Sequence, residues 1–259
     1  MIRRFLPLLI SFLVLILVSP VPSFAQDGAF PEKAFVSNFR GHRQSASLSC
    51  EARSATDLAA FWGIQTSEKK ILRLLPRSDN PNLGFVGTPT DFWGNLPPRS
   101  YGVHARPIAD ALRQIGLQAE AHEGFSVDQL KMEISSGRPV IVWVIGQMMP
   151  GAPQKYVAKD GQAIRVARFE HTMVLIGYEP NVVRVVDAYS GQTQVYSIRE
   201  FKNSWNVLGR MAVTVNGALP KILEPGSAPY KTYLALVFHI PFSNNQAADE
   251  NGSGKFIVR

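Results

Sequence analysis

The sequence predicts an α+β fold in which helices dominate the first half of the chain and an antiparallel sheet forms from the second half. Apolar residues recur at helical spacing through residues 52–62, as they do on the buried face of a helix. Residues 139–146, PVIVWVIG, form an apolar run of the length expected for a buried strand. Two further apolar segments, 171–178 and 182–187, are separated only by a short turn, a connection that joins antiparallel neighbours.

The same periodicity, with the positions of Gly and Pro, predicts the remaining elements. Helices are expected at 67–75, 107–116, 126–136 and 199–206, strands at 192–197, 210–215 and 232–240, and a hairpin at 154–168. Residues 76–106 are rich in Asn, Pro, Gly and aromatic residues, and a loop of this length inside a compact domain is often functional.

The chain begins with the features of a signal peptide. Arg3 and Arg4 precede an apolar stretch at 5–18, and Ser23-Phe24-Ala25 has the small-x-small pattern of a cleavage site. The stretch is shorter than the roughly 20 residues of a membrane-spanning helix, and an uncleaved anchor is the alternative. We therefore expect a protein that is secreted or lies on the exterior of the cell envelope, with no integral membrane segment after cleavage.

Three segments divide the chain. Residues 1–25 are the predicted signal peptide, residues 26–216 the predicted domain, and residues 217–259 a C-terminal extension. Within the extension, residues 244–255 are polar and are expected to be disordered.

Composition argues against several classes of function. The formal net charge is +7, but the basic residues are not clustered, so nucleic acid is not an expected partner. His42, His104, His122 and His239 lack metal-ligand spacing and the chain has a single cysteine, so neither a metal nor another cofactor is expected. Nothing in the sequence indicates an oligomeric state.

Cys50 is that single cysteine, and it follows an export signal. A lone thiol in an oxidising compartment indicates a reactive sulfur or an intermolecular disulfide, and the alternative is a buried cysteine that packs as a small hydrophobe. Ser49 is a favourable helix N-cap and Glu51 suits a first turn, so Cys50 is expected at a helix N-terminus. That position, beside an imidazolium, predicts a lowered thiol pKa.

His171 and Asp187 are the candidates for a general base and its orienting acid. If the hairpin is symmetric about Glu179, His171 lies directly opposite Asp187 on the same face of the sheet. Asp187 then holds one ring nitrogen while the other faces the thiol, as in a nucleophile–base–acid triad. The alternative is that Asp187 caps the following turn and that His171 is a partly exposed strand start.

Gln44 is the candidate oxyanion donor. Its side-chain amide and the backbone N–H of Cys50 offer two donors to the oxyanion of a tetrahedral intermediate. An isolated glutamine is otherwise a solvated loop residue, and only the spacing to Cys50 singles Gln44 out. His104 is the substitute base, with packing of the loop as its alternative role.

These residues, in the order Gln44, Cys50, His171 and Asp187, resemble the papain-like cysteine peptidases, in particular the bacteriocin-processing double-glycine peptidases and their secreted bacterial relatives. The resemblance covers most of residues 40–215 and is carried by QSASLSCEARSATDLAAFWG, NPNLGFVG, YGVHARPIADALRQIGL, SSGRPVIVWV and EHTMVLIGYEPNVVRVVDAYSG. It implies a papain-like fold, with a helical subdomain packed on an antiparallel sheet. It also implies that Cys50 is the nucleophile, His171 the general base and acid, Asp187 the orienting acid and Gln44 the oxyanion donor.

Two positions depart from the family pattern: Glu51 stands where glycine often follows the cysteine, and Ala188 where proline is common. The implied activity is that of a secreted cysteine peptidase, which hydrolyses peptide bonds through a thioester acyl-enzyme and takes a peptide or protein as substrate. Two alternatives stay open, a non-catalytic peptide-binding module on the same scaffold and a thiol acyltransferase.

Overall fold

The computed structural model describes residues 30–217 of the chain. The predicted signal peptide and all but the first residue of the predicted C-terminal extension lie outside the described residues, together with the strand expected at 232–240. Within residues 30–217, no helix combines the length and the apolar character that crossing a membrane requires.

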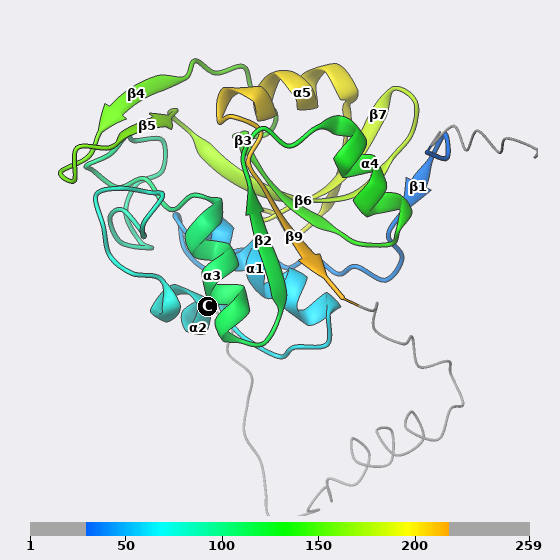
Figure 1. The fold of residues 1–259 in the computed structure, drawn as a ribbon, viewed down its shortest axis with the longest axis horizontal. Helices are drawn as coiled ribbons and strands as arrows, with labels where there is room; N and C mark the ends of the chain where they lie inside the picture. Colours follow the sequence, from blue (N-terminus) through cyan, green and yellow to red (C-terminus); the bar gives the residue numbers. More distant parts are fainter. Residues whose placement is uncertain (1–29, 218–259) are drawn as a thin grey trace, which may run out of the picture.

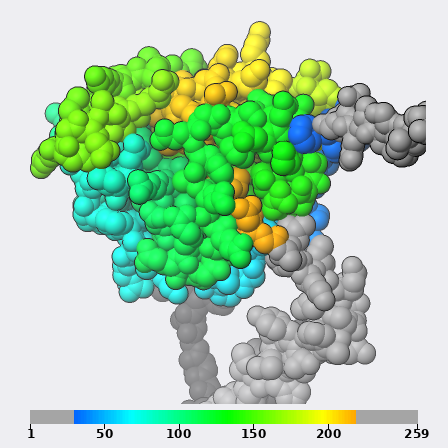
Figure 2. Space-filling model, viewed as in Figure 1, coloured from blue at the N-terminus to red at the C-terminus, as the bar shows by residue number. Residues whose placement is uncertain are grey.

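A seven-stranded antiparallel sheet forms the centre of the structure (Figure 1). Its strands, in spatial order, are β2 (Gln118–His122), β9 (Ala212–Asn216), β3 (Val140–Ile145), β6 (Glu170–Tyr178), β7 (Val182–Asp187) and β8 (Thr193–Ser197), and β1 (Ala34–Phe35) pairs with β6. A separate hairpin of β4 (Gln154–Val157) and β5 (Ala163–Val166) projects from one side of the molecule (Figure 2).

Helices cover both faces of the sheet. On one face lie α1 (Cys50–Phe61), α2 (Glu68–Leu74) and α3 (Ala105–Gln114), and on the other lie α4 (Val127–Ser135) and α5 (Ile198–Val207). Ser67 caps α2, and capping boxes that begin at Ser126 and Ser197 start α4 and α5. Local sequence therefore fixes the starts of α2, α4 and α5, whereas α1 and α3 have no side-chain cap and are held on the sheet by their apolar faces.

Strand β3 shows how the two faces are filled. Alternate side chains enter the core cluster under α1–α3, which includes Ile141, Trp143 and Ile145, or the cluster under α4 and α5, which includes Val140, Val142 and Val144. Because successive side chains of a strand point to opposite faces, a strand covered on both faces needs an apolar residue at every position. All positions of β3 are buried, which accounts for its continuous apolar sequence.

The α+β prediction is confirmed, and the helices and strands predicted within residues 30–217 are present with small shifts at their ends. Strands β1 and β2 were not predicted. Strand β2, QAEAH, consists largely of residues with weak strand propensity, and antiparallel pairing with β9 holds it at the edge of the sheet. The division into a helical first half and a stranded second half is only partial, because α5 lies among the strands of the second half.

Candidate active site

Cys50 is the first residue of α1 and is almost completely buried, with 2% of its surface exposed. Ser49 occupies the N-cap position, but its hydroxyl bonds to the backbone of Ala46 rather than to the helix. As the first helical residue, Cys50 has a backbone N–H without an acceptor inside the helix. The predicted position at a helix N-terminus is confirmed, and the N–H is free to serve a ligand.

The thiol of Cys50 donates a hydrogen bond to Glu51, with Sγ 3.2 Å from Oε2. Burial raises the pKa of the Cys50 thiol well above its usual value, and the charges of Glu51 and Glu170 raise it further. A backbone hydrogen bond from Thr172 acts in the opposite direction and is outweighed. The prediction of a lowered thiol pKa is therefore wrong for this structure, because it omitted burial and the neighbouring carboxylates.

His171 lies in β6, and Asp187 is the last residue of β7. Nε2 of His171 lies 2.7 Å from Oδ1 of Asp187, and both side chains are buried. The predicted register is wrong by two residues, since Met173 rather than His171 pairs with Asp187. A shift of two residues keeps a side chain on the same face, so His171 reaches Asp187 from the diagonal position.

Two local features set this register. The backbone N–H of Glu179 bonds the carbonyl of Val182, so the turn is centred on Pro180-Asn181 rather than on Glu179. The turn alone would shift the predicted pairing by three residues, and a β-bulge between Leu175 and Gly177 shifts it back by one. The two irregularities together return Asp187 to the face that carries His171.

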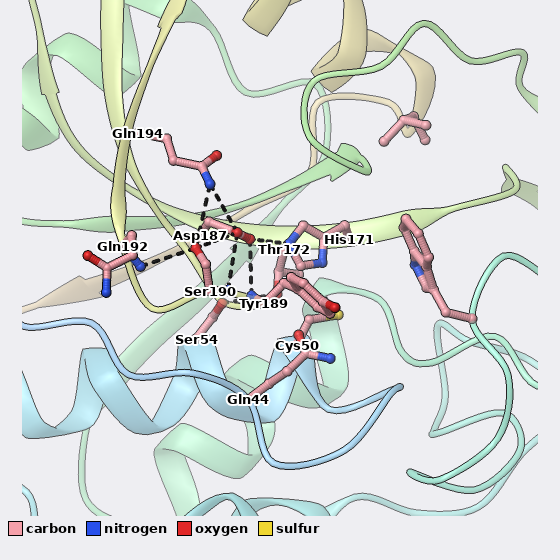
Figure 3. A network of polar contacts seen from close by, with 12 residues as sticks. Gln44, Cys50, Ser54, His171, Thr172, Asp187, Tyr189, Ser190, Gln192 and Gln194 are labelled. Carbon is pink, nitrogen blue, oxygen red and sulfur yellow. Dashed lines mark hydrogen bonds and ion pairs between the residues drawn. The ribbon is translucent and has the colours of Figure 1, made fainter.

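Asp187 accepts hydrogen bonds from four further donors (Figure 3). These are the backbone N–H of Tyr189 at 3.0 Å, the backbone N–H and hydroxyl of Ser190 at 3.2 and 2.7 Å, and the amide of Gln194 at 3.2 Å. Burial raises the pKa of Asp187, but His171 and the other donors outweigh burial and leave that pKa lowered. Asp187 therefore both caps the turn and holds the imidazole, so the two roles considered from the sequence coexist.

The strand residue after His171 connects it to the helix of the cysteine. Oγ of Ser54 lies 3.0 Å from Oγ1 of Thr172, which ties α1 to β6. Sγ of Cys50 lies within 4.8 Å of a carboxylate oxygen of Glu170, the residue before His171, so Cys50 and His171 belong to one site. Within residues 30–217, no hydrogen bond joins Sγ of Cys50 to His171, and Nδ1 of His171 forms none.

Gln44 lies in the loop before α1, and Figure 3 draws its amide close to Cys50. Nε2 donates to the carbonyls of Ala46 at 2.7 Å and Ser47 at 3.2 Å, while Oε1 is buried without a partner. These two carbonyls require the nitrogen on their side of the amide. The amide is thus correctly oriented as a donor, but its hydrogens are engaged within its own loop.

Two buried carboxyl groups, those of Glu51 and Glu170, lie beside the thiol. Oε1 of Glu51 accepts the N–H of Val103 at 2.6 Å, whereas Oε1 of Glu170 has no hydrogen-bond partner. Burial raises the pKa of Glu51 to about 7, and it raises the pKa of Glu170 strongly, with the charge of Glu51 adding to the effect. Neither residue belongs to the predicted site, although each is next to a predicted site residue in the sequence, and this adjacency is the signal that points to them.

Gly102 makes room for the carboxyl groups. Its φ is +108°, and a Cβ atom at this position would lie 2.2 Å from Oε1 of Glu51 and 3.2 Å from Oε2 of Glu170. A side chain here would displace Glu51 from its hydrogen bond with Val103.

Aromatic residues form an exposed apolar surface next to His171. The indole of Trp93, in the long loop, donates to the carbonyl of Glu170 at 2.7 Å. The Trp93 ring packs edge-on against Phe169, with centroids 5.0 Å apart, and against His171 at 6.4 Å. Trp93 and Phe169 are each about two-fifths exposed, so the loop expected to be functional does contribute to the surroundings of His171.

His104, the substitute base, has a packing role. It is buried, with Nδ1 2.6 Å from Oδ1 of Asn82 and Nε2 3.2 Å from the hydroxyl of Tyr101. Burial lowers the pKa of His104 to about 3, so its imidazole is neutral.

A helix that begins at a cysteine and packs on a sheet with a histidine–aspartate pair defines the papain-like class of cysteine-peptidase folds. A sequence profile of the Peptidase_C39 like family matches residues 36–213. The chain belongs to this family.

The first of two similar solved structures supports the fold. A protein of Bacillus anthracis described as a C39-like peptidase superposes with a TM-score of 0.65 at 22% identity, over 73% of this chain and 100% of that chain. A double-glycine motif protease of an AMS/PCAT transporter, crystallised with its leader peptide, gives a TM-score of 0.41 at 15% identity, over 71% of this chain and 99% of that chain.

A curated relative covers less of the chain. The uncharacterised protein YvpB of Bacillus subtilis (strain 168) is 26% identical over 137 residues, which are 52% of this chain and 52% of YvpB. The chain thus spans about half the length of this relative.

Proposed function

We propose that the protein is an exported cysteine peptidase that hydrolyses peptide bonds through a thioester acyl-enzyme. The observation that carries the proposal is the His171–Asp187 hydrogen bond, on a sheet tied by Ser54 and Thr172 to the helix that begins at Cys50. Membership of the Peptidase_C39 like family supports the same chemistry.

The reaction begins with transfer of the thiol proton. Asp187 accepts a hydrogen bond from Nε2 of His171, so Nδ1 is left to accept the proton of Cys50. The carboxylate also stabilises the imidazolium that results. Because the thiol pKa is raised, the thiolate forms during this transfer, when the thiol exchanges its hydrogen bond with Glu51 for one with His171.

Acylation and deacylation use the same groups in turn. The thiolate attacks the carbonyl carbon of the substrate, and the oxyanion accepts hydrogen bonds from the backbone N–H of Cys50 and the amide of Gln44. For this, the Gln44 amide turns one N–H away from the carbonyl of Ser47, the longer of its two contacts. His171 then protonates the leaving amine and afterwards takes a proton from the water that hydrolyses the thioester.

The surroundings of the site favour a peptide with an apolar side chain near the scissile bond. Trp93 and Phe169 offer exposed aromatic surface beside His171, and Phe92 on the same loop is 89% exposed. An apolar side chain seated on these rings would remove their surface from water.

Cleavage of unfolded protein substrates and of a peptide library tests this function. Wild-type protein should cleave, Cys50→Ala should not, and Asp110→Asn should cleave as wild type because Asp110 is a half-exposed residue that pairs with Arg113 on α3. Equal cleavage by Cys50→Ala and wild type would rule the proposal out.

A second candidate is a non-catalytic peptide-binding module on the same scaffold. It is favoured by the raised thiol pKa and by the hydrogen bond from the thiol to Glu51 rather than to His171. Binding of peptides without any cleavage or covalent adduct would support it. A thiol acyltransferase would pass through the same thioester intermediate. If the protein is one, an amine added to the reaction would be found in the products as an amide of the acyl group.

We also propose that residues 1–25 direct export and are removed, which leaves residues 26–216 as the peptidase domain and 217–259 as an extension. The N-terminal sequence of the protein recovered from the host's medium or envelope should begin at Gln26. A chain that retains Met1 inside the cell would contradict this.

A further inference from the structure

Cys50, Glu51 and Glu170 each place one ligand atom within 4.8 Å of the others, and all three side chains are buried. A thiolate sulfur and carboxylate oxygens are among the ligands that Zn²⁺ takes in proteins, at about 2.3 Å and about 2.0–2.2 Å. A tetrahedral ion with these bonds separates its ligand atoms by about 3.3–3.6 Å. Sγ of Cys50 and Oε2 of Glu51 already lie 3.2 Å apart, close to that spacing.

An unsatisfied atom points to a ligand at the same place. Only 2% of the surface of Glu170 is exposed, yet Oε1 of its carboxyl group has no hydrogen-bond partner. A buried carboxyl oxygen without a donor is costly, and a bound cation removes that cost.

Among the described residues, no basic side chain forms an ion pair with the cluster. The ion pairs formed within residues 30–217 include neither Glu51 nor Glu170. Glu51 is nevertheless held in place, because the N–H of Val103 donates to its Oε1 and leaves Oε2 toward the thiol. Such a hydrogen bond to a carboxylate is what orients a metal ligand from outside the coordination sphere.

We propose that Sγ of Cys50 and the carboxylates of Glu51 and Glu170 form a binding site for Zn²⁺ or a similar thiophilic divalent cation. A water molecule completes the tetrahedron. The cation takes the place of the thiol proton and of any proton held by the two carboxyl groups, these protons are released to solvent, and no group is oxidised or reduced. Sequence spacing alone predicted no metal, because two of the three ligands come from one segment and Glu170 comes from a distant strand.

The consequence for activity is inhibition, since a sulfur bound to the cation cannot attack a substrate carbonyl. This consequence rests on the proposed peptidase function, whereas binding of the cation does not. Metal supply would therefore regulate the enzyme by occupying its nucleophile.

Cobalt(II) spectroscopy of the full, metal-free chain tests the site directly. Cys50 is the only cysteine, so any thiolate-to-Co²⁺ charge-transfer band in the near ultraviolet must arise from it. The band should appear in the wild type, vanish in Cys50→Ala and, in Glu170→Gln, require at least about tenfold more Co²⁺. Glu133→Gln is the matched control, because Glu133 is a buried carboxylate on α4 that pairs with Arg138. The affinity of this variant for Co²⁺ should equal that of the wild type.

Absence of the band in the wild type, or equal affinity in the wild type and Glu170→Gln, would overturn the proposal. X-ray absorption of the Zn²⁺-loaded wild type needs no variant, and it should find one sulfur among otherwise oxygen ligands; a shell without sulfur also overturns it. If the band appears in a chain that cleaves nothing, the site stands and the peptidase function fails. If Zn²⁺ binds and cleavage continues unchanged, the inhibitory role fails.

Discussion

Nε2 of His171 lies 2.7 Å from Oδ1 of Asp187, although the two residues occupy diagonal rather than paired positions on β6 and β7. Asp187 is also held by Tyr189, Ser190 and Gln194, so its position does not depend on the imidazole. The acid is therefore fixed in advance, and it sets the ring so that Nδ1 is left for the thiol.

Asp187→Asn should lower kcat by on the order of a hundredfold or more with a smaller change in KM, because the orientation of the base and the charge that stabilises the imidazolium are both lost. Steady-state kinetics on a cleaved peptide measures this. Ser190→Ala is the matched control, since it removes one hydrogen bond to the same carboxylate without contacting His171, and it should retain most of the activity. Equal losses in both variants would show that only the stability of the turn matters.

Gln44→Ala should lower kcat by about 100- to 1,000-fold and leave KM nearly unchanged, because an oxyanion donor acts in the transition state. The same kinetic assay separates the two parameters. A rise in KM with an unaltered kcat would mean that Gln44 binds substrate and does not stabilise the oxyanion.

Glu51→Gln should lower the thiol pKa, because it removes a negative charge in contact with Sγ. The effect should be present above about pH 7, where Glu51 is ionised. The rate of iodoacetamide alkylation of Cys50 should then rise about tenfold near pH 8, for a shift of one pKa unit. Glu68→Gln, a buried carboxylate paired with Arg53, is the control and should react like the wild type. An unchanged rate profile in Glu51→Gln would mean that Glu51 does not contribute to the raised thiol pKa.

The free energy of unfolding should fall as pH rises from about 5 to about 7. The pKa of Glu51 is raised from 4.5 to about 7 in the fold, so the folded chain keeps a proton that the unfolded chain releases. The associated loss is on the order of 3 kcal/mol. Cys50 and Glu170 face the same carboxyl group, and the raised pKa of Glu170 extends the fall to higher pH.

Urea unfolding at several pH values, with metal chelated, measures this slope. It should be much reduced in Glu51→Gln. Asp187 acts in the opposite sense, because its pKa is lowered in the fold. Its ionised carboxylate stabilises the fold at neutral pH, and this stabilisation is lost only when pH falls below the usual pKa of an aspartate. A wild-type stability that stays constant between pH 5 and 7 would contradict the assignment of Glu51.

The parts of the site that sequence predicts are those fixed by local chemistry. The helix at Cys50 follows from the apolar spacing behind it, although the side chain of Ser49 does not cap it, and the strands of His171 and Asp187 follow from their apolar runs. The register between those strands does not follow, because it depends on where a turn is centred and on a bulge. Neither the position of the turn nor the bulge changes the pattern of apolar residues, so the sequence gives no sign of them.

The electrostatics of the thiol depend on side-chain directions that no pattern reveals. Glu51 suits the first turn of a helix, but its carboxylate turns toward Sγ and the N–H of Val103. Glu170 reaches the same place from a distant strand. For Gln44, the sequence predicted an amide near the cysteine but not its hydrogen bonds with Ala46 and Ser47.

The central claim is that Cys50 is a nucleophile activated by His171. It is tested most directly by intact-mass analysis of wild-type protein quenched in acid during reaction with a cleavable peptide ester. We predict a mass increase equal to the acyl portion of the substrate, mapped to Cys50 and absent from His171→Ala. Hydrolysis with no adduct on Cys50, or an adduct that forms equally fast in His171→Ala, would contradict the account.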